Sequence, residues 1–385
     1  MKEKLLVIMY QDFSQEFGAT KKYMEMMGYL QNSFEIILIC SKKGNLLGVK
    51  KIYEVPIIPP RKKDLKSKKI ISIFLNYFIF YIYQIIIITK VLLENKDINF
   101  AHIRHDTYSV PSTIVLSMYG KKIVADGKIF SSYALKFDKR LRITEKILVP
   151  LEKLVLTRYW KFYVYSYNYR TELIKYGLSD NKLFYIPSSI DLNKIPFYPL
   201  NDRNLYNICY FGSLYDYSNV GVLIKAFYLV KKSFPQSLLY IIGDGECYNE
   251  LKEMVKEFSL EESVIFTGHL HTAELYTYFD KFSLMVNPTK LFAGALPTKR
   301  IEAAAAGKVI FEANSEENTE NDESEEGIIY FDATDPLQLS DKICCLFESP
   351  YLIYQYSKRS RQFSKKYDIT NYEKLVNTIK KGGNL

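Results

Sequence analysis

Short apolar segments alternate with amphipathic, helix-like segments along almost the whole chain. In the first half, strand-like runs occupy residues 5–9, 35–40, 100–103, 122–124, 162–165 and 183–186. Helical patterns fill gaps between them, for example at residues 20–30, 145–158 and 168–176. Strands that alternate with helices are typical of parallel sheets with crossover helices. The pattern therefore predicts an α/β protein.

The second half repeats this rhythm after a break. Its strand-like runs occupy residues 208–211, 238–242, 264–267, 284–286, 309–311 and 328–331. Residues 187–204 (PSSIDLNKIPFYPLNDRN) are rich in Pro, Asn and Asp and lack periodicity, which indicates a hinge. We predict two Rossmann-like, doubly wound domains, residues 1–190 and 191–385, that face each other across a cleft. The helical stretch at 351–381 is expected to pack back over the hinge.

The chain has a formal net charge of +9, which favours phosphate-bearing partners. Six cations gather just before an apolar run: Arg61, Lys62, Lys63, Lys66, Lys68 and Lys69. Nucleic-acid binding is not expected, because these cations adjoin an apolar helix rather than an aromatic-studded sheet. A membrane surface with anionic lipid fits the cluster at 61–69 better.

The apolar run at residues 70–89 carries no charge over 20 residues and leaves three interpretations open. It could be a membrane-spanning helix, a buried core helix, or a helix that lies partly in the membrane interface. Asn76 and Gln84 argue against a span. Five scattered cysteines without a C-x-x-C motif fit a reducing cytosol, and the first apolar run is too short for a signal peptide. We expect a cytoplasmic protein, peripheral on the inner face of the plasma membrane if the cluster at 61–69 meets lipid.

Glycines follow several predicted strands where a backbone could approach a phosphate. Gly18 follows the first strand, Gly212 follows ICYF, and Gly243, Asp244 and Gly245 follow LLYII. The alternative is that each glycine only closes a tight turn. No G-x-G-x-x-G motif is present, which disfavours a dinucleotide oxidoreductase.

The segment 295–307, ALPTKRIEAAAAG, holds the densest chemical signal. Thr298 is a candidate N-cap, Lys299 and Arg300 open a helix, and Gly307 ends it. Cations at a helix N-terminus oppose the helix dipole unless an anion binds there. A diphosphate could bind these cations, with Glu302 on ribose hydroxyls. The alternative is an alanine-rich helix with solvated cations.

Several segments, in order, resemble the C-terminal domain of the group 1 retaining glycosyltransferases, which have the GT-B fold. They are YFGSLYDYSNVGVLIKAFYLVKKSFPQSLLYIIGDGECYNELKEMV, VIFTGHLHTAELYTYF, LMVNP and LPTKRIEAAAAGKVI. The segment VPLEKLVLTRYWKFYVYSYNYRTELIKYGLSDNKLFYIPSSID is similar to the end of the family's N-terminal domain, and FGATKKYMEMMGYL to its opening loop and helix. The resemblance implies transfer of a sugar from a nucleotide diphosphate sugar to a glycan or lipid-linked acceptor. It further implies an acceptor-binding first domain, a donor-binding second domain, retention of configuration, and no metal or other cofactor.

Carried over by position, the resemblance assigns roles to individual residues. The donor side comprises Gly18, Gly212, Ser213, Gly243, Asp244, Gly245, Pro297, Thr298 and Arg300. Lys299, Glu302 and Asp126 are expected to act in catalysis, with Glu302 on the ribose. Arg104 and His105 are expected on the acceptor side, and His102 and His105 to face the cleft. No third ligand at metal spacing accompanies these histidines.

The chain also departs from the family pattern. Ser213 and Asn219 stand near the places of the usual Arg and Lys, and Lys299 is expected to replace this clamp. The first glutamate of the family's pair would fall at Gly294, and Ser188-Ser189 replaces a common Asn-Gly. Asp126 stands where a His is often found, and either contacts the sugar or acceptor or closes a turn.

These departures keep two other functions open. The first is epimerisation or hydrolysis of a nucleotide sugar by the same fold. The second is a non-catalytic partner subunit of a glycosyltransferase.

Overall fold

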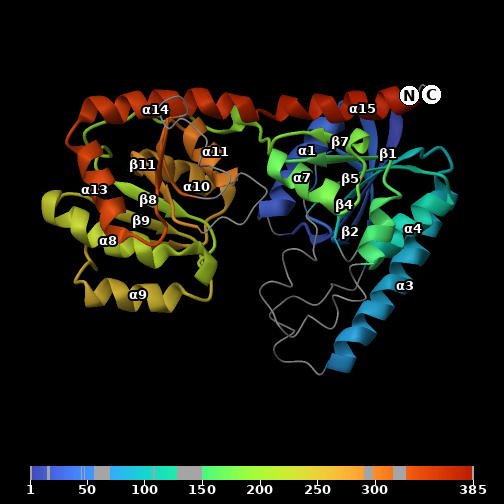
Figure 1. The fold of residues 1–385 in the computed structure, drawn as a ribbon, viewed down its shortest axis with the longest axis horizontal. Coiled ribbons are helices and arrows are strands. Elements are labelled where there is room, and N and C mark those ends of the chain that lie inside the picture. Colours follow the sequence, from blue (N-terminus) through green and yellow to red (C-terminus); the bar gives the residue numbers. More distant parts are fainter. Residues whose placement is uncertain are drawn as a thin grey trace. The chain divides into compact units, whose positions relative to one another are not determined.

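The computed structural model describes residues 2–14, 18–44, 46, 48–55, 70–106, 109–127, 150–289, 298–314 and 327–383. The chain divides into two compact units, Met1–Ser189 with Ile369–Leu385, and Ile190–Asp368. The end of the chain therefore belongs to the first unit, which differs from the predicted second domain of 191–385. Each unit has its own sheet (Figure 1), and buried apolar side chains form separate cores in the two units.

The first unit contains a parallel seven-stranded sheet with the order β3-β2-β1-β4-β5-β6-β7. Its strands are β1 (Glu3–Asp12), β2 (Phe34–Lys42), β3 (Val49–Glu54), β4 (Phe100–His105), β5 (Lys122–Gly127), β6 (Lys161–Val164) and β7 (Leu183–Tyr185). Its helices are α1 (Gly18–Leu30), α3 (Ile70–Glu94), α4 (Val110–Met118), α7 (Tyr167–Lys175) and α15 (Glu373–Gly383). Chain order changes direction at β1, as in a doubly wound domain.

The second unit contains a parallel six-stranded sheet with the order β10-β9-β8-β11-β12-β13. Its strands are β8 (Ile208–Phe211), β9 (Leu239–Ile242), β10 (Val264–Gly268), β11 (Leu284–Asn287), β12 (Val309–Ala313) and β13 (Ile328–Phe331). Its helices are α8 (Val220–Ser233), α9 (Tyr248–Glu257), α10 (Thr272–Tyr278), α11 (Thr298–Ala305), α13 (Pro336–Phe347) and α14 (Pro350–Ser364). The prediction of two Rossmann-like domains is confirmed.

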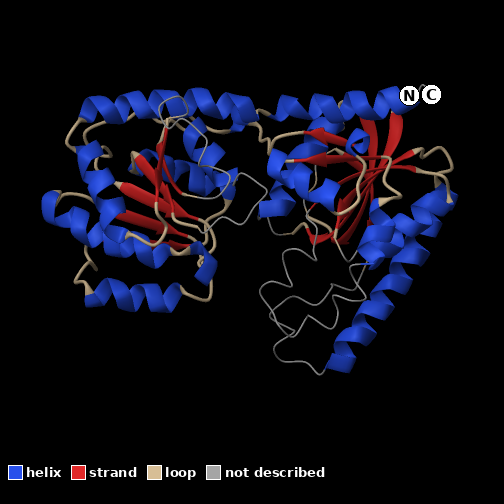
Figure 2. Ribbon diagram, viewed as in Figure 1, coloured by secondary structure: helices blue, strands red, loops and turns tan. Residues whose placement is uncertain are grey.

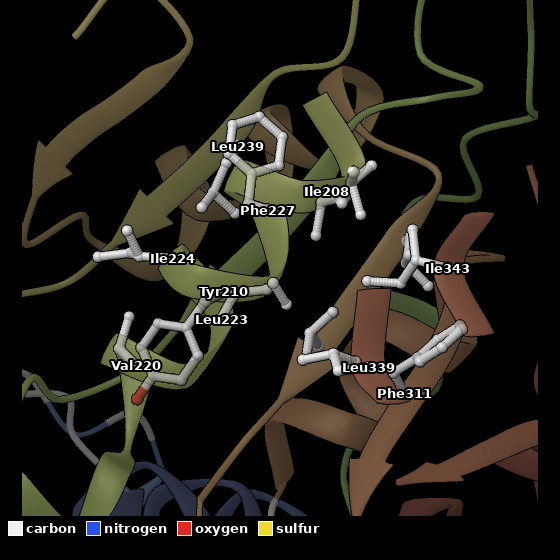
Figure 3. Packing of buried hydrophobic residues seen from close by; sticks show 14 of the residues in the cluster. Ile208, Tyr210, Val220, Leu223, Ile224, Phe227, Leu239, Phe311, Leu339 and Ile343 are labelled. Carbon is white, nitrogen blue, oxygen red and sulfur yellow. The ribbon is translucent and has the colours of Figure 1, made fainter. Parts of the chain in front are cut away.

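Helices cover both faces of each sheet (Figure 2). Alternate residues of β8 enter different cores, because successive side chains of a strand point to opposite faces. Ile208 and Tyr210 pack with Phe227 and Leu339 in one core (Figure 3), whereas Phe211 joins the core under α11. With both faces covered, the short strands can be apolar throughout.

Helix α3 covers the first sheet with one side only. Phe80, Gln84 and Ile88 are fully buried, and the Gln84 side chain accepts a hydrogen bond from Ser112 at 2.8 Å. Phe78 and Ile86 on the other side are 63% and 56% exposed. Within the described ranges, no helix combines the length and hydropathy that a membrane span requires. The basic cluster at 61–69 lies outside the described residues.

The turns after β8 and β9 pack directly against each other. Gly212 donates its N–H to Ile242 O at 2.9 Å, and Gly243 donates to Gly268 O at 2.8 Å. Gly212 and Gly243 have φ values of 145° and 143°, a region that favours glycine. A Cβ on Gly243 would lie 1.8 Å from Gly212 O. Close backbone contact therefore requires Gly243, as the tight-turn interpretation expects.

Replacing Leu375 by Ala should destabilise the first unit and spare the second. The side chain lies on α15 and is fully buried, and Leu→Ala at such positions costs about 2–5 kcal/mol of unfolding free energy. We expect faster amide hydrogen exchange in β4 and β5, with β11 and β12 unchanged. Replacing the exposed Lys374 by Ala provides the control. Faster exchange confined to the second unit would contradict the placement of residues 369–385.

Replacing Gly243 by Ala should lower the free energy of unfolding of the second unit by about 2 kcal/mol or more, because it combines an unfavourable φ with a backbone clash. Chemical denaturation followed by exchange in β8 and β9 measures this. Gly221→Ala in α8 is the matched control, because its new methyl would meet only the flexible Met254 side chain. Equal stability of the two variants would refute the clash.

Candidate functional site

The candidate site of the second unit begins at the turn after β8. Ser213 O accepts hydrogen bonds from Tyr210 OH at 2.7 Å and from Ser218 Oγ at 2.6 Å. The Ser213 hydroxyl lies 3.0 Å from Tyr217 OH. Asp244, in the neighbouring turn, accepts from the Gly245 N–H at 2.7 Å. The polar groups of these residues thus hold the two turns in shape.

The backbone conformation and hydrogen bonds of Asn219 explain why an asparagine stands near the place of a cation in the family pattern. It adopts φ 55°, a left-handed conformation that Asn tolerates better than most residues. Its side-chain amide donates to Ala333 O at 2.6 Å and to Pro288 O at 3.3 Å. The amide therefore ties the start of α8 to two loops, and supplies no positive charge.

Helix α11 brings Lys299 to the Gly212 turn. Thr298, the predicted N-cap, is instead the first residue of the helix, and the residue before it lies outside the described residues. Its end is as predicted: Gly307 has φ 82°, and Lys308 N–H bonds Ala303 O at 2.9 Å.

The Lys299 ammonium lies among the turns that follow β8 and β11. Its Nζ is 4.6 Å from the centroid of the Tyr210 ring and donates to Thr289 Oγ1 at 3.3 Å. A Cβ on Gly212 would be 3.4 Å from the same nitrogen. Burial lowers the Lys299 pKa to about 8, although the charge of Glu312 opposes this change. A desolvated cation beside an open glycine backbone is suited to bind an anion.

Arg300 and Glu302 point into the second unit rather than outward. Arg300 is 1% exposed, and its guanidinium carbon lies 5.2 Å from the Phe363 ring centroid. Glu302 is 5% exposed, and its Oε1 accepts from Tyr276 OH at 3.1 Å. The contact of Arg300 with a donor phosphate stays a prediction. The role of Glu302 toward a ribose stays a prediction.

Sequence reasoning missed a polar chain behind Lys299. Thr289 Oγ1 donates to Asn287 Oδ1 at 2.7 Å, and Asn287 Nδ2 donates to Glu312 Oε1 at 2.6 Å. Asn287 and Glu312 are fully buried. A signal was present, because VIFEA and LMVN each place a polar residue at the end of an apolar strand.

In the first unit, tyrosines surround Asp126 at the end of β5. Asp126 is 2% exposed and accepts hydrogen bonds from Tyr23 OH and Tyr165 OH. Desolvation raises the pKa of both phenols well above 10, and the Asp126 charge raises them further. Gly127 has φ 140°, and a Cβ there would lie 2.3 Å from His105 O. Asp126 could still contact the sugar or acceptor, or serve only to close a turn. Its carboxylate is already hydrogen-bonded inside the first unit.

His102 and His105 differ from the sequence expectation, because both rings are buried in the first unit rather than facing a ligand. His102 Nε2 lies 3.0 Å from Tyr163 OH and 3.5 Å from Asp126 Oδ1. His105 uses both nitrogens, Nδ1 with Tyr159 OH at 2.8 Å and Nε2 with Glu152 at 3.1 Å. Because side chains alternate along a strand, His102 and Arg104 lie on one face of β4 and His105 on the other, and Arg104 is half-buried.

Gly18 begins α1, which is consistent with its expected position between β1 and the first helix. Among the described residues, no three His, Cys, Asp or Glu side chains gather in a way that could hold a metal ion.

Comparison with known proteins relates the second unit to a family. Residues 206–349 match the family model described as Glycosyl transferases group 1. A curated Haemophilus influenzae protein, named an uncharacterized glycosyltransferase, is 28% identical over 167 residues. That match covers 43% of this chain and 45% of the relative, so it spans about half the length of each.

Solved structures extend the likeness to the fold of the whole chain. Anabaena Alr3699/HepE, crystallised with UDP and glucose, has a TM-score of 0.76 at 13% identity, covering 98% of this chain and all of that one. Sucrose-phosphate synthase from Thermosynechococcus elongatus has a TM-score of 0.73 at 14% identity, covering 100% and 98%. Such low identity establishes the fold alone, which is GT-B. Residues 206–349 are therefore similar to the group 1 glycosyl transferases, and the two parallel sheets of the chain are those of the GT-B fold.

Proposed function

We propose that this protein is a retaining glycosyltransferase that transfers a hexose from a nucleoside diphosphate sugar to a lipid-linked or polysaccharide acceptor. The observation that carries the proposal is the half-buried Lys299 ammonium beside the Gly212 turn. Structural neighbours crystallised with UDP and with UDP-glucose support a donor of this class. The family match supports transfer as the reaction class.

The main chemical demand of sugar transfer is stabilisation of the leaving diphosphate. Negative charge grows on the phosphate as the bond to the anomeric carbon breaks, so fixed positive groups lower the barrier. Lys299 has few competing partners, since its described hydrogen bond runs to a neutral hydroxyl. The free N–H groups at the start of α11 would add to this charge. We propose that these groups stabilise the leaving diphosphate without a metal ion, so a chelator should leave the rate unchanged.

Lys299→Ala should slow turnover by one to three orders of magnitude, a loss of about 1.4–4 kcal/mol of transition-state stabilisation. The measurement is initial rate with a donor found by thermal-shift screening of nucleotide sugars. Lys225→Ala provides the matched control, because Lys225 is exposed on α8 of the same unit. A folded Lys299→Ala protein with unchanged turnover would remove Lys299 from the mechanism.

Two rival functions are separated by simple assays. An epimerase or hydrolase would release altered or free sugar whether or not an acceptor is present, whereas a transferase would make glycosylated acceptor. A non-catalytic subunit would show no stabilisation by any nucleotide sugar. A ligand at 100 times its dissociation constant should stabilise a binding protein by about 2.7 kcal/mol.

We further propose that α3 binds the surface of an anionic membrane, where lipid-linked acceptors would be found. Its outer side presents large apolar side chains at helical spacing: Leu75, Phe78, Ile82, Ile85, Ile86 and Leu93, each between 41% and 63% exposed. The basic cluster at 61–69 directly precedes α3 in the sequence. An apolar helix face next to cations is typical of helices at membrane surfaces. This placement corresponds to a cytoplasmic, peripheral protein.

Replacing both Phe78 and Ile86 by Asp should reduce binding to vesicles of phosphatidylglycerol and phosphatidylcholine about tenfold or more, because each side chain loses its apolar transfer energy. Vesicle flotation measures the bound fraction. Leu337→Asp is the control, because Leu337 is 58% exposed on α13 of the second unit. Binding should weaken with salt and with neutral vesicles. Salt-insensitive flotation would contradict the electrostatic part, and unchanged flotation of the double variant would contradict the role of α3.

A further inference from the structure

A row of side chains leads from Lys299 to a buried carboxylate on a neighbouring strand. Lys299 donates to Thr289, Thr289 to Asn287, and Asn287 to Glu312, over distances of 3.3, 2.7 and 2.6 Å. Every step runs in the same donor direction, so each bond polarises the next. The row begins with a cation beside the Gly212 turn and ends with an acid that is 0% exposed.

The sheet register fixes the inner half of this row. Parallel pairing of β11 with β12 sets Asn287 opposite Glu312. Asn287 is the last residue of β11, and Glu312 is the last but one of β12. The Asn287 amide can then donate to Glu312 only while its oxygen faces Thr289, which fixes its orientation. The acid is thereby held at a constant distance from the lysine.

The Glu312 carboxylate lies near two cations, Arg300 and Lys299, but is only partly hydrogen-bonded. Among the described residues, its Oε2 has no hydrogen-bond partner, and the same is true of Nε and Nη1 of the buried Arg300. Burial raises the Glu312 pKa, while Arg300, the Asn287 hydrogen bond and Lys299 all lower it. A buried acid kept between two cations is costly as a purely structural element, because replacement by an apolar residue is often neutral or stabilising. Its position therefore calls for a functional reason.

We propose that Glu312 is a positioning residue, the counter-charge that keeps Lys299 protonated and aimed at the Gly212 turn. This proposal rests on the proposed function in that Lys299 binds the donor diphosphate. Without the carboxylate, the described neighbours that the lysine contacts are Tyr210, Thr289 and the Cys209 thiol, whose pKa burial raises well above 9. Its neutral form would then become favoured, and a neutral amine stabilises a phosphate poorly.

The direct test is the ionisation of Lys299 in the free protein, which needs no donor. Competitive labelling with acetic anhydride between pH 6 and 10, quantified by mass spectrometry, reports the pKa of individual lysines, with Lys225 as internal reference. In the unaltered protein the Lys299 pKa should be about 8. In Glu312→Gln it should fall by about one, which raises its relative reactivity at pH 7.5 about threefold. An unchanged Lys299 pKa would overturn the proposal.

Three further variants make the test decisive. Glu253→Gln, the same change on the surface of α9, should leave Lys299 labelling unchanged. If Glu312→Gln fails to fold, Thr289→Val should lower the Lys299 pKa by removing its acceptor, and Thr289→Ser should restore it. A Thr289→Val protein that labels like the unaltered protein would also overturn the proposal.

Turnover measurements test whether the hydrogen-bonded row from Lys299 to Glu312 matters for activity. The kcat/KM for the donor should fall about fivefold at pH 8 in Glu312→Gln and less than twofold at pH 6.5, because the protonated lysine is the binding form. A uniform loss at all pH values would indicate a merely structural role and would overturn the proposal. Full turnover of Lys299→Ala would instead defeat the proposed function, while the labelling result would still decide whether Glu312 sets the Lys299 pKa.

Discussion

The parallel pairing of β11 with β12 is the constraint on which the site of the second unit depends. It sets Asn287 beside Glu312 at the carboxyl ends of two buried strands, and α11 starts over the same edge of the sheet. Loops that follow such strand ends provide the ligand sites of doubly wound domains, because side chains and free backbone groups meet there. The charge of Lys299 is thus held by secondary structure rather than by a loop alone, and its distance from the Gly212 turn is set by the fold.

This arrangement places charges where apolar residues would give more stability. Lys299 and Arg300 of α11 lie close to Glu312 of β12. Among the described residues, Glu312 and Arg300 retain buried side-chain atoms without hydrogen bonds. Each such atom costs free energy that the two apolar cores of the unit must offset. Proteins retain such costs mainly at functional sites. The apolar packing around Ile208, Leu223 and Phe227 on the opposite face of the sheet shows no comparable defect among its described members.

Much of the fold could be predicted from the sequence, because strand and helix periodicities are local. The glycine turn after β9 and the end of α11 at Gly307 followed from local rules as well. Strand β3 (VKKIYE) was missed, since it is an edge strand with exposed lysines and no continuous apolar run. The Glu312–Asn287 pair and the tyrosines around Asp126 could not be predicted. Their members lie 25 and more residues apart and meet only in the folded chain, through sheet register for Asn287 and Glu312 and through the packing of α1 for Tyr23. His102 and His105 were misplaced, because the sequence did not reveal that both faces of β4 are buried at these two positions.

The buried acids Asp126 of the first unit and Glu312 of the second unit have different surroundings, and this difference matters for the proposed mechanism. Asp126 receives hydrogen bonds from the two phenols of Tyr23 and Tyr165, so both of its carboxylate oxygens have partners inside the first unit. Glu312 faces cations and transmits its charge along a row toward Lys299. A lysine held by a distant carboxylate can exchange its neutral partner for phosphate without breaking an ion pair. The proposed mechanism therefore relies on stabilising the leaving group, which agrees with the neutral hydrogen-bond partner described for Lys299.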